Sequence, residues 1–286
     1  MIKIITDSNS DRSKEYYQKN DVEVIPFSYF IESEEYIDDF ETSLSVEQFY
    51  DLIKSGKLST TSQINPFTFE ETFSKYLEEG MDVIYLGFSS ELSKSFSNAV
   101  LAANNLNEKY SNIVTCINSV SATAGQALLL DKLIELRENG TSYDNIIDII
   151  DEIKIRTNIW FTVDDLDHLK RGGRISPAAA NIANAIKIKP IMNLSKEGKI
   201  EPIKKVRGRK KAIKQLYSDW MKNTTDDEKQ DVYITHGDCI EDAHVLADLI
   251  KGHNPKINIV INPVGPVIGS HTGQGVIVLS YIGVSR

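Results

Sequence analysis

Short apolar segments alternate with longer amphipathic ones along most of the chain. The short segments are rich in Ile, Val, Tyr and Phe and are bounded by Gly, Pro, Asn, Asp or Ser, which is typical of β-strands. The predicted strands lie at residues 2–6, 22–30, 83–88, 113–117, 159–163, 186–194, 199–203, 232–236, 257–264 and 276–281.

The segments between the predicted strands have a helical period. In residues 95–109, for example, Phe96, Ala99, Ala103 and Leu106 recur every three or four positions and fall on one helix face. Alternation of strands and helices favours an α/β fold with a largely parallel sheet. The predicted helices lie at residues 45–54, 67–79, 95–109, 128–137, 143–156, 210–222 and 240–251.

The alternation changes after residue 156. Only Ser195-Lys196-Glu197-Gly198, a sequence typical of a hairpin turn, separates the predicted strands 186–194 and 199–203. We therefore predict two domains. The first is an N-terminal α/β domain with a parallel sheet at 1–156, and the second is a C-terminal α+β domain with a mixed sheet at 157–286.

Composition and charge narrow the class of protein. The 286 residues are 41% hydrophobic and 26% charged, which is typical of a globular protein and excludes disorder or a disulfide scaffold. With 32 basic and 41 acidic residues the formal net charge is −9, so nucleic acid is a poor default partner.

The cysteines and the apolar segments indicate the cellular compartment of the protein. Two cysteines, Cys116 and Cys239, are expected to be buried thiols in a reducing cytosol. The first residues do not resemble a signal peptide, and no run of 18 apolar residues occurs. We therefore expect a cytoplasmic protein without integral membrane association.

The first candidate for chemistry directly follows the first predicted strand. Acidic and amide side chains alternate from Asp7 to Asp11, as at the start of a calcium loop. However, Arg12 stands where that loop requires Gly, and Gln18 stands where it requires an acid. Turn capping by Asp7 and Ser10 is the preferred interpretation. Because no His-x-x-x-His or Cys-x-x-Cys spacing occurs either, we predict no metal site.

Two hydroxyl-rich clusters come next. Residues 59–66 lead into a predicted helix and are compatible with either a capped turn or a ligand site. Residues 89–95 join a strand to a helix, where free backbone N–H groups favour an anion. The sequence after Gly87 lacks the second Gly of a nucleophile elbow. No dinucleotide-binding or Walker A glycine pattern occurs.

Three later clusters combine glycine or basic residues. Gly172-Gly173 permits a tight turn or the close approach of a ligand, and Arg174 follows directly. Residues 265–275 hold four glycines around His271, which suggests a tight loop. The basic run at 204–214 is open to three interpretations: a solvated helix face, a dock for phosphate or an acidic partner, or an RNA site that lacks stacking aromatic residues.

Taken in order along the chain, these motifs resemble those of the DegV family, the bacterial fatty-acid-binding proteins. The matching segments are 6–11 (TDSNSD), 61–63 (TSQ), 89–93 (SSELS), 172–176 (GGRIS), 189–191 (KPI), 207–212 (RGRKKA) and 265–273 (GPVIGSHTG). The resemblance implies a Rossmann-like N-terminal sheet, a C-terminal mixed-sheet domain, and one long-chain fatty acid between them.

The resemblance also implies a role. Such a protein is the acyl-carrying subunit of a bacterial fatty acid kinase, in which a separate ATP-binding subunit phosphorylates the carboxylate of the bound fatty acid. The acyl-phosphate then feeds phospholipid synthesis. The carrier itself is expected to have no catalytic residue and no cofactor.

The resemblance assigns residues to three roles. Thr61, Ser62, Ser93 and His271 match those that meet the carboxylate. Arg174 and Arg207 match basic residues at the pocket mouth, where the kinase would be met. The residues expected in loops that shape the pocket are Ser119, Gly172, Gly173, Gly269 and Gly273.

This chain departs from the family pattern at three places. Lys94-Ser95 replaces the usual Gly-Thr, Ile64 replaces a Pro, and Asn118-Ser119 replaces Asp-Ser. Two alternative functions stay open at this point. One is a hydrolase or esterase that uses Ser93 and His271, and the other is nucleic-acid binding through residues 204–214.

Overall fold

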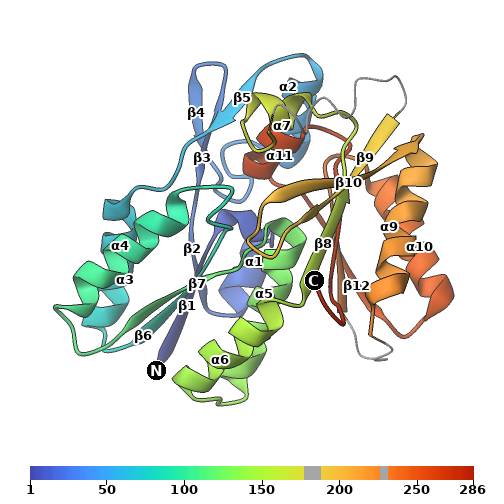
Figure 1. Cartoon of the computed structure of the whole chain (residues 1–286). Coiled ribbons are helices and arrows are strands. Elements are labelled where there is room, and N and C mark those ends of the chain that lie inside the picture. Colours follow the sequence, from blue (N-terminus) through green and yellow to red (C-terminus); the bar gives the residue numbers. More distant parts are fainter. Residues whose placement is uncertain (177–187, 226–230) are drawn as a thin grey trace.

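The computed structural model describes residues 1–176, 188–225 and 231–286, and three sheets organise them (Figure 1). The first is a parallel sheet in the order β2-β1-β6-β7. Its central strands are almost entirely buried, as expected for a parallel sheet covered on both faces. The strands are β1 (Ile2–Asp7), β2 (Val22–Ile25), β6 (Asp82–Gly87) and β7 (Val114–Asn118).

The second is a six-stranded mixed sheet in the order β10-β9-β8-β13-β11-β12. All its neighbours are antiparallel except β11 and β12. Its strands are β8 (Thr157–Thr162), β9 (Ile188–Leu194), β10 (Ile200–Arg207), β11 (Asp231–His236), β12 (Asn258–Pro263) and β13 (Ile277–Ile282). The α/β fold with one parallel and one mixed sheet is therefore confirmed.

Helices fill the space between and around these sheets. Helix α5 (Thr123–Glu138) contacts β1 and β6 of the parallel sheet and β8, β11 and β13 of the six-stranded sheet, so it lies between the two (Figure 1). Helices α9 (Arg209–Asn223) and α10 (Ile240–His253) cover the outer face of the six-stranded sheet. The remaining long helices are α2 (Val46–Lys54), α3 (Pro66–Glu78), α4 (Ser95–Asn107) and α6 (Tyr143–Lys154).

The predicted strand at 22–30 is wrong as a single element. Pro26 interrupts it, because proline has no N–H for a sheet ladder. The second half is β3 (Ser28–Ile31), which leaves the parallel sheet and pairs with β4 (Glu34–Ile37) and β5 (Ser59–Thr61) in a small antiparallel sheet. The hydroxyl-rich cluster at 59–66 thus begins as a strand.

Helix starts follow the local sequence closely. The Ser45 hydroxyl accepts a hydrogen bond from the Gln48 amide, and the Gln48 side-chain oxygen accepts one from the Ser45 amide, which forms a capping box before α2. The Asn65 side chain accepts from the Thr68 amide and Pro66 takes the first helical position of α3. The predicted 45–54 and 67–79 helices are therefore confirmed within one residue at their starts.

Other boundaries differ from the prediction. The helix expected at 128–137 begins five residues earlier, at Thr123. Residues Thr123 to Ala127 are buried and small or polar, so they lack the amphipathic spacing that would indicate a helix. The loop expected at 265–275 contains the short helix α11 (Pro266–Thr272). The short elements α1 (Lys14–Lys19), β4 and α7 (Asp167–Arg171) were not expected. The strand predicted from residue 186 begins at Ile188, and residues 186–187 lie outside the described residues.

Candidate functional site

A cavity of about 340 Å³ lies between the end of the parallel sheet and the inner face of the six-stranded sheet. Its wall is built from β5, the β6–α4 loop, the start of α5, strands β8, β9, β10 and β13, and helices α7 and α11. Ligand cavities of about 300–1,000 Å³ are usual for small molecules. We call this space the site cavity.

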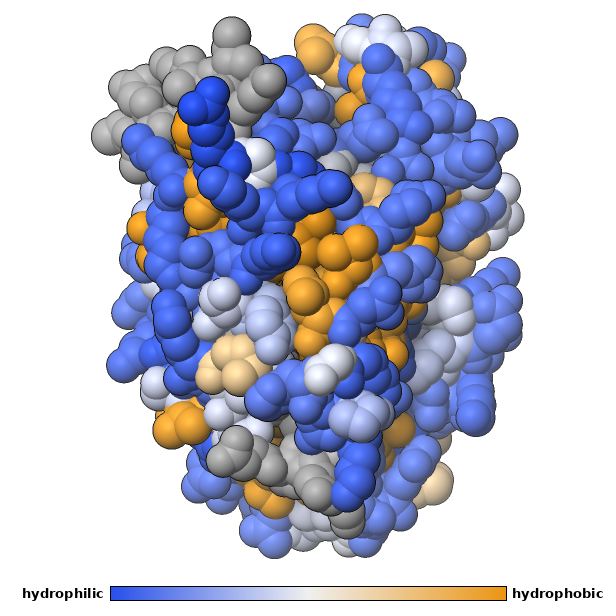
Figure 2. All heavy atoms as spheres, turned by 90° about the vertical axis from the view of Figure 1, so that its right-hand side faces the viewer, coloured by the Kyte–Doolittle hydropathy of each residue, from blue (hydrophilic) through white to orange (hydrophobic). Residues whose placement is uncertain are grey.

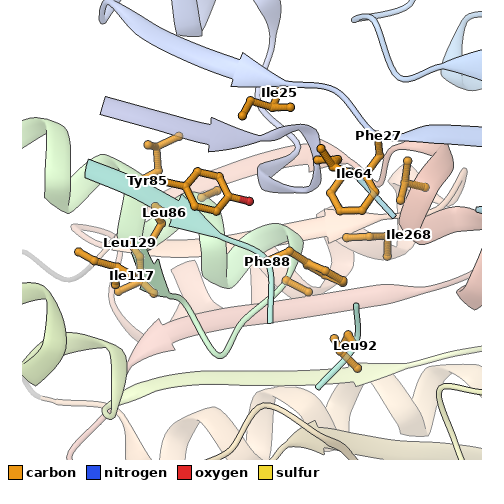
Figure 3. Close-up of a cluster of buried hydrophobic side chains, with 14 of the residues drawn as sticks. Ile25, Phe27, Ile64, Tyr85, Leu86, Phe88, Leu92, Ile117, Leu129 and Ile268 are labelled. Atoms are coloured by element: carbon orange, nitrogen blue, oxygen red, sulfur yellow. The ribbon is translucent and has the colours of Figure 1, made fainter. Parts of the chain in front are cut away.

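Most of the wall is apolar. Figure 3 shows Phe27, Phe88 and Ile268 converging from separate segments of the chain, and all three line the site cavity. Phe161 from β8 and Leu194 from β9 close the side formed by the six-stranded sheet. The other apolar lining residues are Leu92, Ala122, Ile159, Leu169, Ile200, Val267 and Val278. A cavity with this wall is suited to a hydrocarbon chain.

Polar side chains also line the site cavity, and we call the part of the wall around Thr61, Arg174 and His271 its polar end. Five of the six residues assigned to the carboxylate and the pocket mouth line the site cavity, namely Thr61, Ser62, Ser93, Arg174 and His271. They come from four segments that are far apart in the sequence, so the tertiary structure brings them together. Gln63, Lys94, Thr123 and Thr272 add further polar groups.

Thr61 and His271 are in direct contact. The Thr61 Oγ1 atom lies 2.7 Å from His271 Nε2, and Nδ1 of the same ring is buried without a hydrogen-bond partner among the described residues. A proton on Nδ1 would be a buried N–H without an acceptor, which is rarer and costlier than a bare lone pair. The ring therefore carries its proton on Nε2 and donates it to Thr61 Oγ1. The Thr61 hydroxyl hydrogen is left to donate to a ligand.

The His271 ring is neutral near pH 7. Burial, together with charge repulsion from the nearby Arg174 and His168, lowers its pKa to about 3. The ring can therefore fix Thr61 by donating a hydrogen bond, but it brings no positive charge to the site.

Gly172 makes room for this ring. A Cβ atom at Gly172 would lie 2.1 Å from His271 Nδ1, which is much closer than any real contact. Its φ of −71° is ordinary, so it is the neighbouring ring and not the backbone that requires glycine here. Gly173 differs: its φ is +70°, and a Cβ there would meet nothing within 4 Å.

Arg174 provides the positive charge. Its Nε atom donates to the Leu92 carbonyl at 3.0 Å and its Nη1 atom donates to the Gly172 carbonyl at 2.6 Å, so the guanidinium is held in place. Burial lowers its pKa from the ordinary value. Among the described residues, no carboxylate lies within ion-pairing distance of Arg174. The site cavity therefore contains a fixed cation that suits an anionic ligand.

Ser93 stands at the start of α4. Its Oγ atom accepts a hydrogen bond from the Ser95 amide at 3.2 Å and lies 3.0 Å from Ser95 Oγ. Ser95 Oγ in turn accepts from the Ile64 amide at 2.9 Å. Two departures from the family pattern, Ile64 and Ser95, are thus bonded to each other. The usual proline at position 64 would have no N–H to donate.

Hydrogen bonds connect helix α11 and the two residues before it to distant parts of the chain. Ser270 Oγ lies 2.5 Å from Ser59 Oγ, and the Tyr50 hydroxyl donates to the Val264 carbonyl at 3.1 Å. Asp11 Oδ1 accepts from the Gly265 amide at 3.1 Å. These contacts, together with Thr61, hold His271 at the polar end of the site cavity.

The other assigned residues lie outside the site cavity wall. Arg207 is exposed at the end of β10. Ser119 is buried and bonds within its own turn, donating to the Ser121 carbonyl at 3.2 Å. Gly269 allows α11 to pack on α2, because a Cβ there would lie 2.7 Å from Phe49. A Cβ at Gly273 would lie 2.6 Å from the His168 ring.

Asp7 and Ser10 cap the turn after β1. Asp7 Oδ1 accepts from the Asn9 amide at 3.1 Å, and Ser10 Oγ donates to the Asp7 carbonyl at 3.1 Å. Asp7 Oδ2 also accepts from the Phe88 amide and the Tyr85 hydroxyl, both at 2.8 Å, so it positions one wall of the site cavity. Burial raises the pKa of this carboxyl. The preference for turn capping is confirmed.

The geometry does not form a hydrolytic triad. His271 Nε2 is bonded to Thr61 rather than to Ser93, and His271 Nδ1 has no acid to orient it. No group of three His, Cys, Asp or Glu side chains in the described part of the chain is arranged to hold a metal. Cys116 and Cys239 are free thiols, and both are partly rather than fully buried. None of the described helices is long and apolar enough to cross a membrane.

Sequence reasoning did not name the apolar wall of the site cavity. Phe27, Phe88 and Phe161 sit on separate segments, and nothing local distinguishes them from core residues. The contact between Gly172 and His271 was also missed, because it joins positions about a hundred residues apart. The local signal for this contact was the Gly-Gly pair beside Arg174.

Comparisons with known proteins agree with this architecture. A family model described as "Uncharacterised protein, DegV family" matches residues 1–284. A DegV domain-containing protein of Clostridium perfringens is 37% identical over 284 residues, which is 99% of this chain and 98% of the relative.

Two solved structures cover 99% of both chains. The DegV family protein from Thermus thermophilus, described as binding fatty acid, has 26% identity and a TM-score of 0.88. DegV of Bacillus subtilis, described as a fatty acid binding protein, has 30% identity and a TM-score of 0.84. The chain belongs to the DegV family.

Proposed function

We propose that this protein binds one long-chain fatty acid in the site cavity, with the carboxylate at the polar end. The supporting observation is the fixed guanidinium of Arg174, which has no described acidic partner, in the wall of a cavity that is mostly apolar. A buried carboxylate is costly unless it is paired and hydrogen-bonded. Arg174 would supply the charge, and Thr61 and Ser62 would supply hydroxyl donors.

The apolar wall would provide most of the affinity. A saturated tail of about 14 methylenes at ~0.8 kcal/mol each contributes a gross ~11 kcal/mol. Losses of ~4–15 kcal/mol on association offset much of that. Each charge-assisted hydrogen bond adds roughly 1.5–3 kcal/mol. Tail burial therefore sets the retention of the ligand, while the polar end fixes its orientation.

Two relatives with similar folds support the class of ligand. The proteins from Thermus thermophilus and Bacillus subtilis are described as fatty acid binding. This chain shares that fold over nearly its full length and has a mostly apolar cavity between its two sheets.

We further propose that the protein is a carrier without catalytic activity of its own. It would present the carboxylate to a separate ATP-dependent kinase subunit that forms the acyl-phosphate. The uncompensated charge of Arg174 would also suit the phosphate of the product. Arg207, exposed at the end of β10, is the residue we assign to contact with that subunit.

The test begins with native mass spectrometry of freshly purified protein, followed by organic extraction and lipid analysis. One adduct of fatty-acid mass, released on denaturation, is the expected result. Protein free of lipid that also fails to take up added palmitate or oleate would refute the carrier function. The kinase step is then tested separately, by mixing loaded protein with the cognate kinase subunit and ATP and measuring acyl-phosphate.

A hydrolase is tested with the same preparation. Release of acid from a long-chain p-nitrophenyl ester, abolished in both Ser93→Ala and His271→Gln, would support the hydrolase instead. We expect no turnover above that of Ser93→Ala, because Ser93 and His271 do not contact each other.

A further inference from the structure

The charged side chains in the wall of the site cavity are all positive. The described lining residues include two with a positively charged side chain, Lys94 and Arg174, and none that is Asp or Glu. His271 adds no charge, because its ring is neutral near pH 7. A ligand in the site cavity therefore meets two positive charges and no negative one from the described wall.

Lys94 and Arg174 belong to the same part of this wall. Nε of Arg174 donates to the Leu92 carbonyl at 3.0 Å, and Leu92 comes two residues before Lys94. Ser93, which stands between them, also lines the site cavity. Because a lysine side chain is long and flexible, the ammonium group of Lys94 can reach a head group that Arg174 holds.

The charge of Lys94 has no acidic partner in the part of the chain that the structure describes. The side chain is exposed, and none of the ion pairs between described residues includes it. Glu91 is the acidic residue nearest to it in the sequence, and Glu91 pairs with Lys199 at 3.3 Å. The ammonium group of Lys94 is therefore available to an anionic ligand.

Lys94 does not stabilise the helix that it precedes. It lies directly before α4, and its side chain makes no capping hydrogen bond. The N-terminal end of a helix carries a partial positive charge, so a cation there is unfavourable unless an anion lies beside it. A bound anion in the site cavity, rather than the stability of α4, therefore accounts for a lysine at this position.

The charge of the head group distinguishes two classes of ligand. A carboxylate carries one negative charge, which Arg174 alone can balance. A phosphate group attached through one of its oxygens carries about −1.5 to −2 at pH 7 and offers three acceptor oxygens. Such a group can pair with both Arg174 and Lys94 and still accept a hydrogen bond from Thr61.

We propose that Lys94 is a specificity-determining residue of the site cavity, which together with Arg174 favours ligands whose hydrocarbon chain ends in a phosphate over ligands that end in a carboxylate. This inference rests on the proposed function, since it places the hydrocarbon chain in the same cavity. Lys94 stands where the family pattern has Gly, so this preference belongs to this chain rather than to the pattern.

The experiment compares two ligands with similar tails, hexadecyl phosphate and palmitate. Each is used to displace a fluorescent fatty acid from protein freed of lipid. We expect wild type to bind hexadecyl phosphate at least roughly tenfold more tightly than palmitate, equivalent to ~1.4 kcal/mol. Lys94→Gln should lower the affinity for hexadecyl phosphate at least roughly tenfold and that for palmitate less than about threefold.

Two variants serve as controls. Lys94→Arg keeps the positive charge and should retain the preference for the phosphate. Lys214→Gln removes an exposed lysine of α9 that does not line the site cavity. Helix α9 lies on the side of the molecule that Figure 2 shows, where hydrophilic residues surround an apolar patch. Lys214→Gln should leave both affinities unchanged, because Lys214 is one of the solvated charges of that side.

Three results would overturn the inference and leave the proposed function standing. The first is a wild-type protein that binds both ligands with similar affinity. The second is a Lys94→Gln variant in which both affinities fall alike. The third is an equal loss in Lys94→Gln and Lys214→Gln, which would mean that only the net charge of the protein matters.

Failure of the proposed function gives a different result, namely wild-type protein that binds neither palmitate nor hexadecyl phosphate. Circular dichroism melting of each variant confirms that it is folded. Lys94→Gln should melt no lower than wild type, because Lys94 makes no ion pair with a described residue.

Discussion

The Thr61 hydroxyl lies 2.7 Å from Nε2 of His271, and this contact joins residues 210 positions apart. It ties β5 to α11 at the polar end of the site cavity. Because the ring is neutral and no described residue bonds to its Nδ1, the tautomer and the direction of the bond are set together.

Replacing Thr61 by Val removes the hydroxyl that accepts the hydrogen bond from His271, while the side chain keeps nearly the same shape. The Nε2 hydrogen of His271 would then be buried without a partner, so we expect a loss of about 1–3 kcal/mol in the free energy of unfolding. Urea denaturation measures it. Thr61→Ser keeps the hydroxyl and should recover most of the loss, whereas equal losses in both variants would mean that packing of the methyl group is what matters.

His271 makes stability depend on pH in a defined direction. Its pKa is about 3 in the folded protein and about 6.5 when unfolded, so only the unfolded chain binds the proton between these values. Stability is therefore lost as the pH falls below about 6.5, by about 2 kcal/mol at pH 5.

The measurement compares wild type with His271→Gln at pH 7 and pH 5. Burial raises the pKa of Asp7, Asp11 and Asp38, that of Asp38 to about 7, so these carboxyls act in the opposite direction. They are present in both proteins and cancel in the difference. Wild type should lose about 2 kcal/mol more than the variant on acidification. Equal losses would show that His271 is protonated in the folded protein near pH 5.

Gly172→Ala should damage the site more than Gly173→Ala. The added Cβ at position 172 would lie 2.1 Å from His271 Nδ1, so the ring must move. We expect oleate affinity to fall at least roughly tenfold. Gly173→Ala strains a backbone with φ +70° but meets nothing, so it should cost about 1 kcal/mol in stability with little change in affinity. Affinities lowered alike in both variants would contradict a specific role for the space at Gly172.

Arg174→Gln tests the charge at the polar end. We expect oleate affinity to fall roughly tenfold or more, because a charge-assisted bond is worth about 1.5–3 kcal/mol. The affinity for oleyl alcohol, which has no carboxylate, should change little. Arg171→Gln is the neighbouring control, since Arg171 is exposed and bonds to His168. A variant that loses both ligands equally would point to a collapsed site cavity instead.

The Ser93→Ala variant distinguishes retention of the fatty acid from presentation of its carboxylate to the kinase subunit. Because tail burial dominates binding, we expect retention of the fatty acid to fall by less than about threefold, ~0.6 kcal/mol. Phosphorylation by the kinase subunit should fall further, because the carboxylate loses one fixed neighbour. Ser90→Ala is the control, since Ser90 bonds to Asn118 outside the site cavity wall. Similar losses of retention and phosphorylation would contradict this division of roles.

Local sequence determined most of the elements correctly. The capped starts of α2 and α3 follow from Ser45 and Asn65, whose side chains accept hydrogen bonds from amides three residues ahead. The hairpin between β9 and β10 follows from the turn that ends at Gly198, which has φ +90°. Such features are encoded within a few residues, so they can be read without knowing the fold.

Features that depend on distant neighbours were missed. The start of α5 has no amphipathic period because it is buried between two sheets and meets protein on every side. The glycine-rich segment before β13 forms α11 because Asp11, Tyr50 and Ser59 fasten it from the other end of the chain. No window of sequence contains both sides of those contacts.

The family pattern named polar residues that meet in one cavity, but it did not give their arrangement. Arg174, Thr61 and His271 do line one cavity, whereas Arg207 and Ser119 lie outside its wall. Whether a residue lines the cavity depends on its burial and on the direction of its side chain, and matching sequence positions specify neither.

The sequence by itself determined the alternation of strands and helices, the mixed character of the second sheet, and the caps. These depend on periodicity and on contacts between near neighbours. Only the tertiary structure decided which glycine makes room for the His271 ring and which apolar residues line the site cavity. Those properties arise from packing between segments that can be more than two hundred residues apart, and the free energy of such packing belongs to the pair rather than to either segment.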